Sequence, residues 1–210
     1  MKAFIPISVG NPVFTRDATE KLIARAEDLS QDVIIVVCDS LRIIANRLRS
    51  DQTQQEAITK ARKATDDTIQ MLKKLKTKSD RTRILKSSEF CEEFEFKNIE
   101  ENVRKTTISN DILLNYISAV VLEYMRRIQI DSTVKNTLLE TEYVLHETAI
   151  SIYCTSVLKY NFEIYKDGGN GFIDYFSVWC KENMNNLKYV NDRKLLNWSD
   201  INMKTSLSGI

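Results

Sequence analysis

The chain has 210 residues, of which 43% are hydrophobic and 28% charged, with a formal net charge of +1. This balance is typical of one soluble globular domain. No apolar run approaches the roughly 20 residues that a membrane span requires, and residues 1–6 hold too short an apolar core for a signal peptide. We therefore expect a cytoplasmic protein without a membrane partner.

The cysteines point to the same compartment. They show no C-x-x-C spacing, which favours reduced thiols over a metal site or a disulfide framework. The four are Cys38, Cys91, Cys154 and Cys180.

The net charge hides an asymmetry along the chain. Between Lys60 and Lys86 there are ten Lys or Arg residues against three Asp, whereas between Glu89 and Glu101 there are six Glu against one Lys. One locally basic stretch in a balanced protein can bind a polyanion at a single place.

The first forty residues read as a strand, a helix and a second strand. Residues 2–8 form an apolar run, and residues 15–29 carry an apolar stripe that begins with a capping-box pattern at Asp17 and Glu20. Residues 32–39 contain a continuous β-branched run, which suits a parallel strand covered on both faces. This order predicts a βαβ unit.

Helices and strands continue to alternate through the rest of the chain. The predicted helices cover residues 41–48, 52–76, 111–128, 138–150 and 173–184. The predicted strands cover residues 83–85, 152–158, 162–165 and 187–190, with a turn at 167–171 and a frayed tail at about 199–210. Without a repeat or a linker, this predicts a single α/β domain over residues 1–210.

Ser8, Gly10 and Asn11 follow the first strand at its corner with the first helix, where α/β sheets bind ligands. Ser8 is either a turn residue that caps the next helix or a nucleophile. In the second case Gly10 lets the backbone approach a substrate, and Asn11 hydrogen-bonds to it. The chain has no G-x-S-x-G elbow, P-loop or dinucleotide fingerprint, and His146 is its only histidine.

Tyr143 and Glu147 are four residues apart, so they share a helix face. They are either an exposed polar pair or a phenol and a carboxylate that hold a cationic α-amino group. His146 lies roughly 100° around that helix from Glu147, and we interpret it as peripheral. Tyr160 ends an apolar run, where it is either a core tyrosine or a proton relay.

The predicted helix over residues 52–76 is basic on one side. Its cations are either a solvated face or a phosphate-binding surface with salt-sensitive, sequence-independent contacts. They are Lys60, Lys63, Lys74 and Lys78 near one line and Arg62 and Lys73 on an adjacent one.

Three motifs and this helix together resemble the cyclodipeptide synthases, which make a diketopiperazine from two aminoacyl-tRNAs. The motifs are Ser8-Val9-Gly10-Asn11-Pro12-Val13-Phe14, Tyr143-Val144-Leu145-His146-Glu147 and Ser156-Val157-Leu158-Lys159-Tyr160. The resemblance implies a single Rossmann-like domain with a mostly parallel sheet flanked by helices. That fold is similar to the catalytic domains of class I tyrosyl- and tryptophanyl-tRNA synthetases, whose ATP-site signatures this chain lacks.

The resemblance also implies roles for individual residues. Ser8 matches the nucleophile, Tyr143 and Glu147 match the pair that holds the substrate amino group, and Tyr160 matches an active-site tyrosine. Asn11 matches the position that defines the larger subfamily, but Asn161 replaces the histidine that this subfamily carries after the tyrosine. Phe96 stands near the place of another active-site tyrosine. The implied pocket for the first amino acid is lined by Phe4, Pro6, Val36 and Leu158, and Lys73 and Lys74 fall on the tRNA-binding helix.

The expected activity is that of a tRNA-dependent aminoacyltransferase. It would form two peptide bonds by a ping-pong mechanism, through aminoacyl- and dipeptidyl-enzyme esters on Ser8. We expect a monomer that uses no cofactor or metal, with a hydrophobic first amino acid. A non-catalytic tRNA- or RNA-binding domain and a Ser-dependent aminoacyl-ester hydrolase are the alternatives, which product analysis distinguishes.

Overall fold

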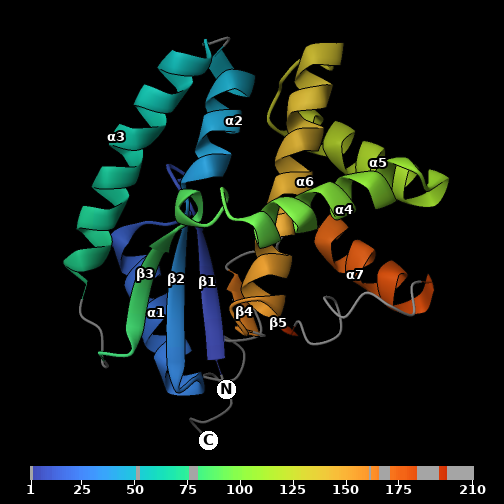
Figure 1. Ribbon diagram of the computed structural model, residues 1–210. Helices are drawn as coiled ribbons and strands as arrows, with labels where there is room; N and C mark the ends of the chain where they lie inside the picture. The colour runs from blue at the N-terminus through green and yellow to red at the C-terminus, as the bar shows by residue number, and fades with distance from the viewer. Residues whose placement is uncertain are drawn as a thin grey trace, which may run out of the picture.

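Five parallel strands form the centre of the protein (Figure 1). The computed structural model describes residues 2–50, 53–75, 80–160, 162–165, 171–183 and 194–197. Within these residues the strand order is β3-β2-β1-β4-β5, and every adjacent pair is parallel. The strands are β1 (Lys2–Ser8), β2 (Asp32–Cys38), β3 (Thr82–Lys86), β4 (Phe162–Tyr165) and β5 (Lys194–Asn197). This is the predicted α/β fold with its parallel sheet.

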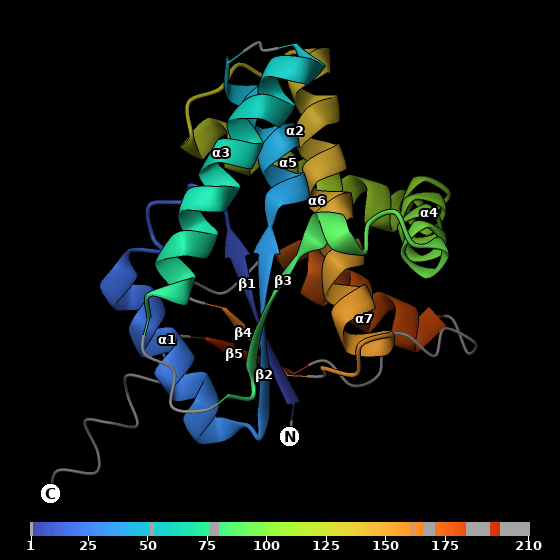
Figure 2. The same ribbon diagram turned by 60° about the vertical axis from the view of Figure 1, so that its left-hand side comes forward.

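Helices cover both faces of the sheet (Figure 2). On one face lie α1 (Arg16–Leu29) and α3 (Gln54–Lys73). The other face is covered by the four helices α4 (Phe94–Ile108), α5 (Asp111–Arg127), α6 (Val134–Ser156) and α7 (Gly171–Asn183). Helix α2 (Asp39–Ser50) leaves the end of β2, and the 3₁₀ turn η1 (Ser87–Glu89) follows β3.

Alternation along β1 assigns its side chains to two separate cores. Ala3, Ile5 and Ile7 pack with α1 and the end of α3. Phe4 packs on the opposite face, against α6. Because side chains alternate with a period of two, Pro6 and Ser8 lie on the same face as Phe4. Ser8 therefore ends β1 on the side of the sheet that α6 covers.

The start of the first helix differs from the prediction. Thr15 is the N-cap, and its Oγ1 accepts a hydrogen bond from the Ala18 N–H at 3.3 Å. Asp17 already lies in the first turn, where its carboxylate pairs with Lys21 at 2.8 Å. The predicted capping box at Asp17 and Glu20 is therefore wrong, because the helix begins two residues before the position that this box requires.

The predicted strand over residues 152–158 is also wrong. Helix α6 continues to Ser156, and hydroxyls along it bond to carbonyls four residues earlier, as Thr155 does to Ser151. This half of α6 is buried all round, so its sequence is apolar without the one-sided stripe of a surface helix. In the sequence alone, an apolar run without such a stripe has the pattern of a buried strand, and for this reason a strand was predicted here.

Two elements were not predicted, and some predictions lie outside the described residues. Helix α4 was missed in the acidic segment, although Phe96, Ile99 and Val103 repeat at helical spacing, and β5 was missed as well. The predicted strand 187–190, most of the turn at 167–171 and the tail 199–210 fall outside the part that the structure describes. None of the described helices is long and apolar enough to cross a bilayer.

Candidate functional site

Ser8 is half-buried at the carboxyl end of β1, where the chain makes a tight turn. The Asn11 N–H donates to the Ser8 carbonyl at 3.1 Å, and Gly10 has φ +72°. A positive φ at the third residue defines a type II turn, which favours glycine there. The Oδ1 atom of Asn11 then accepts from the Val13 N–H at 3.1 Å. The turn thus holds Ser8 at the sheet edge, and Asn11 closes it.

Gly10 is exposed, but the end of one side chain lies close to it. A Cβ atom at this position would lie 2.8 Å from Nη1 of Arg42, a half-buried residue on α2 whose guanidinium donates to the Val9 carbonyl at 3.3 Å. The backbone angle therefore favours glycine, whereas the end of the flexible Arg42 side chain can move aside.

Gly10→Ala should lower the free energy of unfolding by about 1–2 kcal/mol, because an alanine is strained at positive φ. Urea unfolding measures this loss. The matched control repeats Gly10→Ala in an Arg42→Ala background, which removes the crowding atoms but leaves the backbone angle. We expect the same loss there. A loss that disappears with Arg42 would show that crowding, and not φ, decides the choice of glycine.

Glu147 on α6 acts electrostatically on Cys38, the residue that ends β2. Ser8 and Cys38 are register partners on adjacent strands, whose backbones lie about 4.8 Å apart. Burial raises the pKa of the Cys38 thiol well above its usual value, and the charge of Glu147 is the second cause. The carboxylate therefore sits close to Cys38. Tyr143, one helical turn earlier on the same face of α6, packs against the core of that side.

The residues of the implied amino-acid pocket lie together under α6. Phe4 and Val36 are fully buried, Pro6 pairs with Val36 across the sheet, and Leu158 packs against the same core. Glu163 on β4, the register partner of Phe4, is only 3% exposed and accepts a hydrogen bond from Ser151 at 2.8 Å. No local pattern marks this buried carboxylate, because its burial depends on the contacts of β4 with β1 and α6.

Tyr160 lies at the opposite end of the sheet from Ser8. Its hydroxyl donates to Asp32 Oδ2 at 3.0 Å and accepts from Arg83. Asp32 pairs with Lys2, six residues before Ser8, which corresponds to about 20 Å along the strand. Because α6 runs on to Ser156, the chain turns back only at the amino edge and enters β4 there. Tyr160 therefore does not meet the other predicted catalytic residues, and Asn161 lies outside the described residues.

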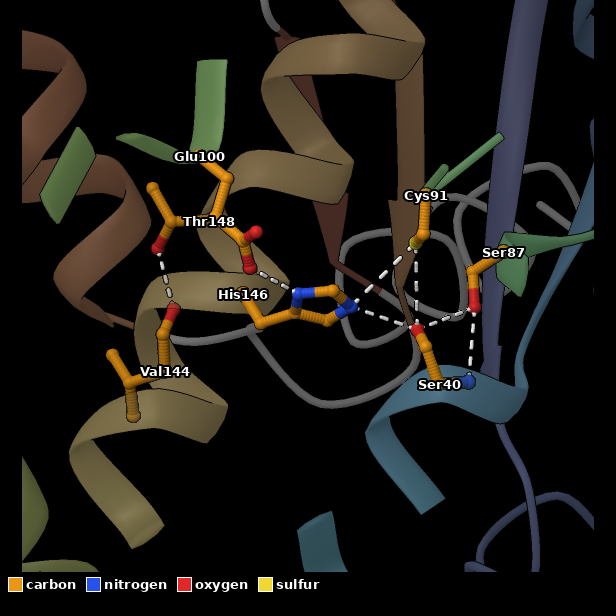
Figure 3. Close-up of polar contacts among 7 residues, drawn as sticks. All are labelled: Ser40, Ser87, Cys91, Glu100, Val144, His146 and Thr148. Atoms are coloured by element: carbon orange, nitrogen blue, oxygen red, sulfur yellow. Dashed lines mark hydrogen bonds and ion pairs between the residues drawn. The ribbon is translucent and has the colours of Figure 1, made fainter. Parts of the chain in front are cut away.

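His146, interpreted from the sequence as peripheral, is instead buried in a polar network (Figure 3). Its Nδ1 lies 2.5 Å from Oε1 of Glu100, and its Nε2 lies 2.8 Å from Oγ of Ser40. The Phe96 ring packs edge-on against it, with centroids 5.4 Å apart. Phe96 is fully buried and so supports the imidazole from the core. The helical wheel placed His146 away from Glu147 correctly, but it could not show that α4 and α2 cover that side.

The basic helix carries its cations on the surface. Lys60, Arg62 and Lys63 are exposed on α3, Lys73 is its last residue, and Lys74 is its exposed C-cap. Lys78 lies beyond the described segment. The described cations thus lie exposed on the face of the sheet opposite α6, in two groups separated by the exposed Asp66 and Asp67.

The chain was compared with known proteins. Neither a protein-family model nor a curated protein matches it. Among solved structures, a CDPS (cyclodipeptide synthase) from Fluoribacter dumoffii matches with TM-score 0.76 and 20% identity, over 93% of this chain and 87% of that chain. AlbC, a cyclodipeptide synthase from Streptomyces noursei, matches with TM-score 0.71 and 15% identity, over 97% and 98% of the two chains. The chain has the cyclodipeptide synthase fold.

The similarity to a tRNA synthetase is confirmed at the level of the fold. Tyrosyl-tRNA synthetase from Archaeoglobus fulgidus matches with TM-score 0.62 and 12% identity, over 93% of this chain and 53% of that chain. Within this fold, Ser8 ends β1 on the side of the sheet that α6 covers, and Tyr160 lies at the other edge.

Proposed function

We propose that the protein is a cyclodipeptide synthase, an aminoacyltransferase that joins the amino acids of two aminoacyl-tRNAs and releases a diketopiperazine. One observation carries the proposal. In a fold shared with cyclodipeptide synthases, Ser8 ends the central strand beside Cys38, and the charge of Glu147 on α6 acts on that cysteine. To form an aminoacyl ester on the enzyme, a hydroxyl must accept the acyl group, and a neighbouring carboxylate can hold the amino group of the substrate.

In the proposed mechanism Ser8 is acylated once and carries first an aminoacyl ester and then a dipeptidyl ester. Its Oγ attacks the ester carbonyl of the first aminoacyl-tRNA, and the 3′-terminal hydroxyl of that tRNA leaves with the proton. The amine of the bound aminoacyl group then attacks the ester carbonyl of the second aminoacyl-tRNA, which releases the second tRNA and leaves a dipeptide ester on Ser8. Finally the terminal amine attacks this ester, closes the six-membered ring and frees the Ser8 hydroxyl.

Tyr143 and Glu147 would hold the amino group of the first amino acid during acylation of Ser8, until it loses a proton and attacks the second ester. A carboxylate and a phenol on one helix face can bind an ammonium by charge-assisted hydrogen bonds. The proton transfers are not assigned to Tyr160, whose hydroxyl bonds to Asp32 and Arg83. The imidazole of His146 contacts Ser40 and not Ser8. The leaving hydroxyl or the substrate amine would therefore serve as the base.

The deciding experiment is product analysis. The protein is incubated with tRNA charged with radiolabelled amino acids, the reaction is quenched, and products are identified by mass spectrometry. A cyclic dipeptide supports the proposal. Release of the free amino acid alone would show an aminoacyl-ester hydrolase, and binding without turnover would show a tRNA-binding domain. Either of these results overturns the proposed function.

Lys73→Glu with Lys74→Glu should raise the KM for aminoacyl-tRNA by about 10-fold or more and leave the fold intact, because both side chains are exposed at the end of α3. Each lost phosphate contact lowers the slope of log KM against log salt by about 0.9, so we expect a slope about 1.8 smaller than that of the wild type.

The control reverses two exposed lysines on the opposite face of the sheet, Lys105 of α4, which pairs with Glu101, and Lys181 of α7. The change in net charge is the same, so only the position of the charges differs. Equal effects of the two double variants would contradict a tRNA surface on α3.

A further inference from the structure

Four segments meet at His146 (Figure 3). Glu100 comes from α4, Ser40 from the start of α2, and Cys91 from the segment after η1, with its Sγ 3.6 Å from Nε2. Ser87 then joins Ser40 through two contacts, at 2.7 Å between the hydroxyls and at 3.2 Å from the Ser40 N–H. The network therefore ties α6 to three other elements at the carboxyl edge of the sheet.

The directions of these hydrogen bonds follow from the proton count. Three donors point at the Asp39 carboxylate: the Ser87 hydroxyl at 2.9 Å, and the N–H and hydroxyl of Ser88. The single proton of Ser87 is thus used on Asp39, and the contact between the two serine oxygens needs the proton of Ser40. The Ser40 oxygen can then only accept from His146, so Nε2 carries a proton.

The other ring nitrogen is also a donor. The hydrogen bond from His146 is the largest cause that lowers the pKa of Glu100 below its usual value of 4.5, and the charges of His146, Arg104 and Lys97 lower it further. Glu100 is therefore an ionised acceptor at neutral pH, and Nδ1 donates to it. With both nitrogens protonated, His146 is an imidazolium between a carboxylate and a hydroxyl oxygen.

This arrangement has the appearance of a Ser-His-Glu triad but the opposite polarity. In a hydrolytic triad the serine donates to a neutral imidazole. Here the Ser40 proton points to Ser87, and the imidazolium donates to Ser40. Ser40 is thus not activated as a nucleophile. The network instead has a geometric consequence, because His146 stands immediately before Glu147 and three residues after Tyr143 on one continuous helix.

We propose that His146 is a positioning residue, whose charged ring, held between Glu100 and Ser40, fixes the rotation of α6 so that Tyr143 and Glu147 face Ser8. This role rests on the proposed function of that pair. The titratable or charged groups that face the ring are Glu100 from α4 and Cys91 after η1, with Asp39 of α2 beyond the two serines. Loss of the ring charge would break one of its two hydrogen bonds and loosen α6.

The protonation state is tested by NMR. His146 is the only histidine, so histidine-selective ¹⁵N labelling of the full chain gives the signals of a single ring. We expect two protonated nitrogens in the wild type at pH 7, and a smaller protonated fraction in Glu100→Gln, which removes the carboxylate charge. A neutral tautomer in the wild type at pH 7 overturns the inference, whatever the protein catalyses.

Kinetics tests the positioning role. Glu100→Gln and His146→Gln should lower kcat by about 10-fold or more and change the KM for aminoacyl-tRNA less than about 2-fold, because a small rotation of α6 misplaces the amino group and not the tRNA. The matched control is Glu101→Gln, the exposed neighbour that pairs with Lys105. Circular dichroism confirms that each variant is folded.

The outcomes separate this inference from the proposed function. If the wild type makes a cyclic dipeptide and a folded His146→Gln keeps the wild-type kcat, the positioning role is wrong and the proposed function stands. If the wild type makes no cyclic dipeptide from any aminoacyl-tRNA, the proposed function fails, and the positioning role that rests on it fails too. A kcat loss shared equally by Glu101→Gln also contradicts the role.

Discussion

Ser8→Ala is expected to abolish both the acyl-enzyme and the cyclic product, with a loss of at least about 10³-fold in turnover. In the proposed reaction both covalent intermediates are esters of the Ser8 oxygen. The fold should persist, because the Ser8 carbonyl and not its hydroxyl accepts the hydrogen bond that closes the turn. Intact-protein mass spectrometry after incubation with aminoacyl-tRNA detects the missing adduct, and product analysis detects the missing ring.

The control is Ser118→Ala, at an exposed serine on α5 whose hydroxyl bonds to its own helix. Ser8→Cys adds a second test, because a thiol is also a nucleophile and should still form an adduct. If Ser8→Ala keeps wild-type turnover, Ser8 is a turn residue, and the mechanism proposed above is wrong.

Glu147→Gln should lower kcat/KM by about 10- to 100-fold. A hydrogen bond to a charged group contributes about 1.5–3 kcal/mol, and the amide of glutamine cannot pair with an ammonium as a carboxylate does. The expected loss appears in the rate of aminoacyl-enzyme formation, measured in a single turnover. Glu142→Gln is the control on the same helix, because five residues of offset place it on a different side of α6.

A change of substrate isolates the contact. If tRNA carries an α-hydroxy acid in place of the amino acid, the ester remains but the ammonium is gone. We expect Glu147→Gln to acylate from this substrate as fast as the wild type does. A variant that is equally slow with both substrates would show that Glu147 acts on something other than the amino group.

Local patterns in the sequence predicted the elements with a clear period. β1 and β2 are continuous apolar or β-branched runs, and they lie where the prediction placed them. The prediction failed where tertiary burial changes the pattern. The second half of α6 is buried on all sides, so its sequence lacks the one-sided apolar stripe that indicates a helix. Helix α4 was not predicted, because its few buried residues, Phe96, Ile99 and Val103, stand in a largely charged segment and form only a short stripe.

The same distinction between local patterns and tertiary contacts applies to the candidate site. Ser8 and Glu147 could be predicted because each depends on local geometry, the end of a strand and a helix face. Tyr160 could not, since its place depends on how far α6 runs before the chain turns back. His146 gained its role from Glu100 and Ser40, which are 46 and 106 residues away in sequence. Contacts at such separations leave no trace in a local pattern.

Helix α6 also limits how the protein could be redesigned. Along one side of its 23 residues it carries Tyr143, Glu147 and Ser151, and the last of these bonds to the buried Glu163 beneath the implied amino-acid pocket. The pair proposed to hold the amino group and one wall of the implied pocket thus belong to the same continuous helix. To change the amino-acid preference by grafting segments from another protein, α6 and β4 would have to be exchanged together. If only one were exchanged, Ser151 or Glu163 would lose its hydrogen-bond partner in the core.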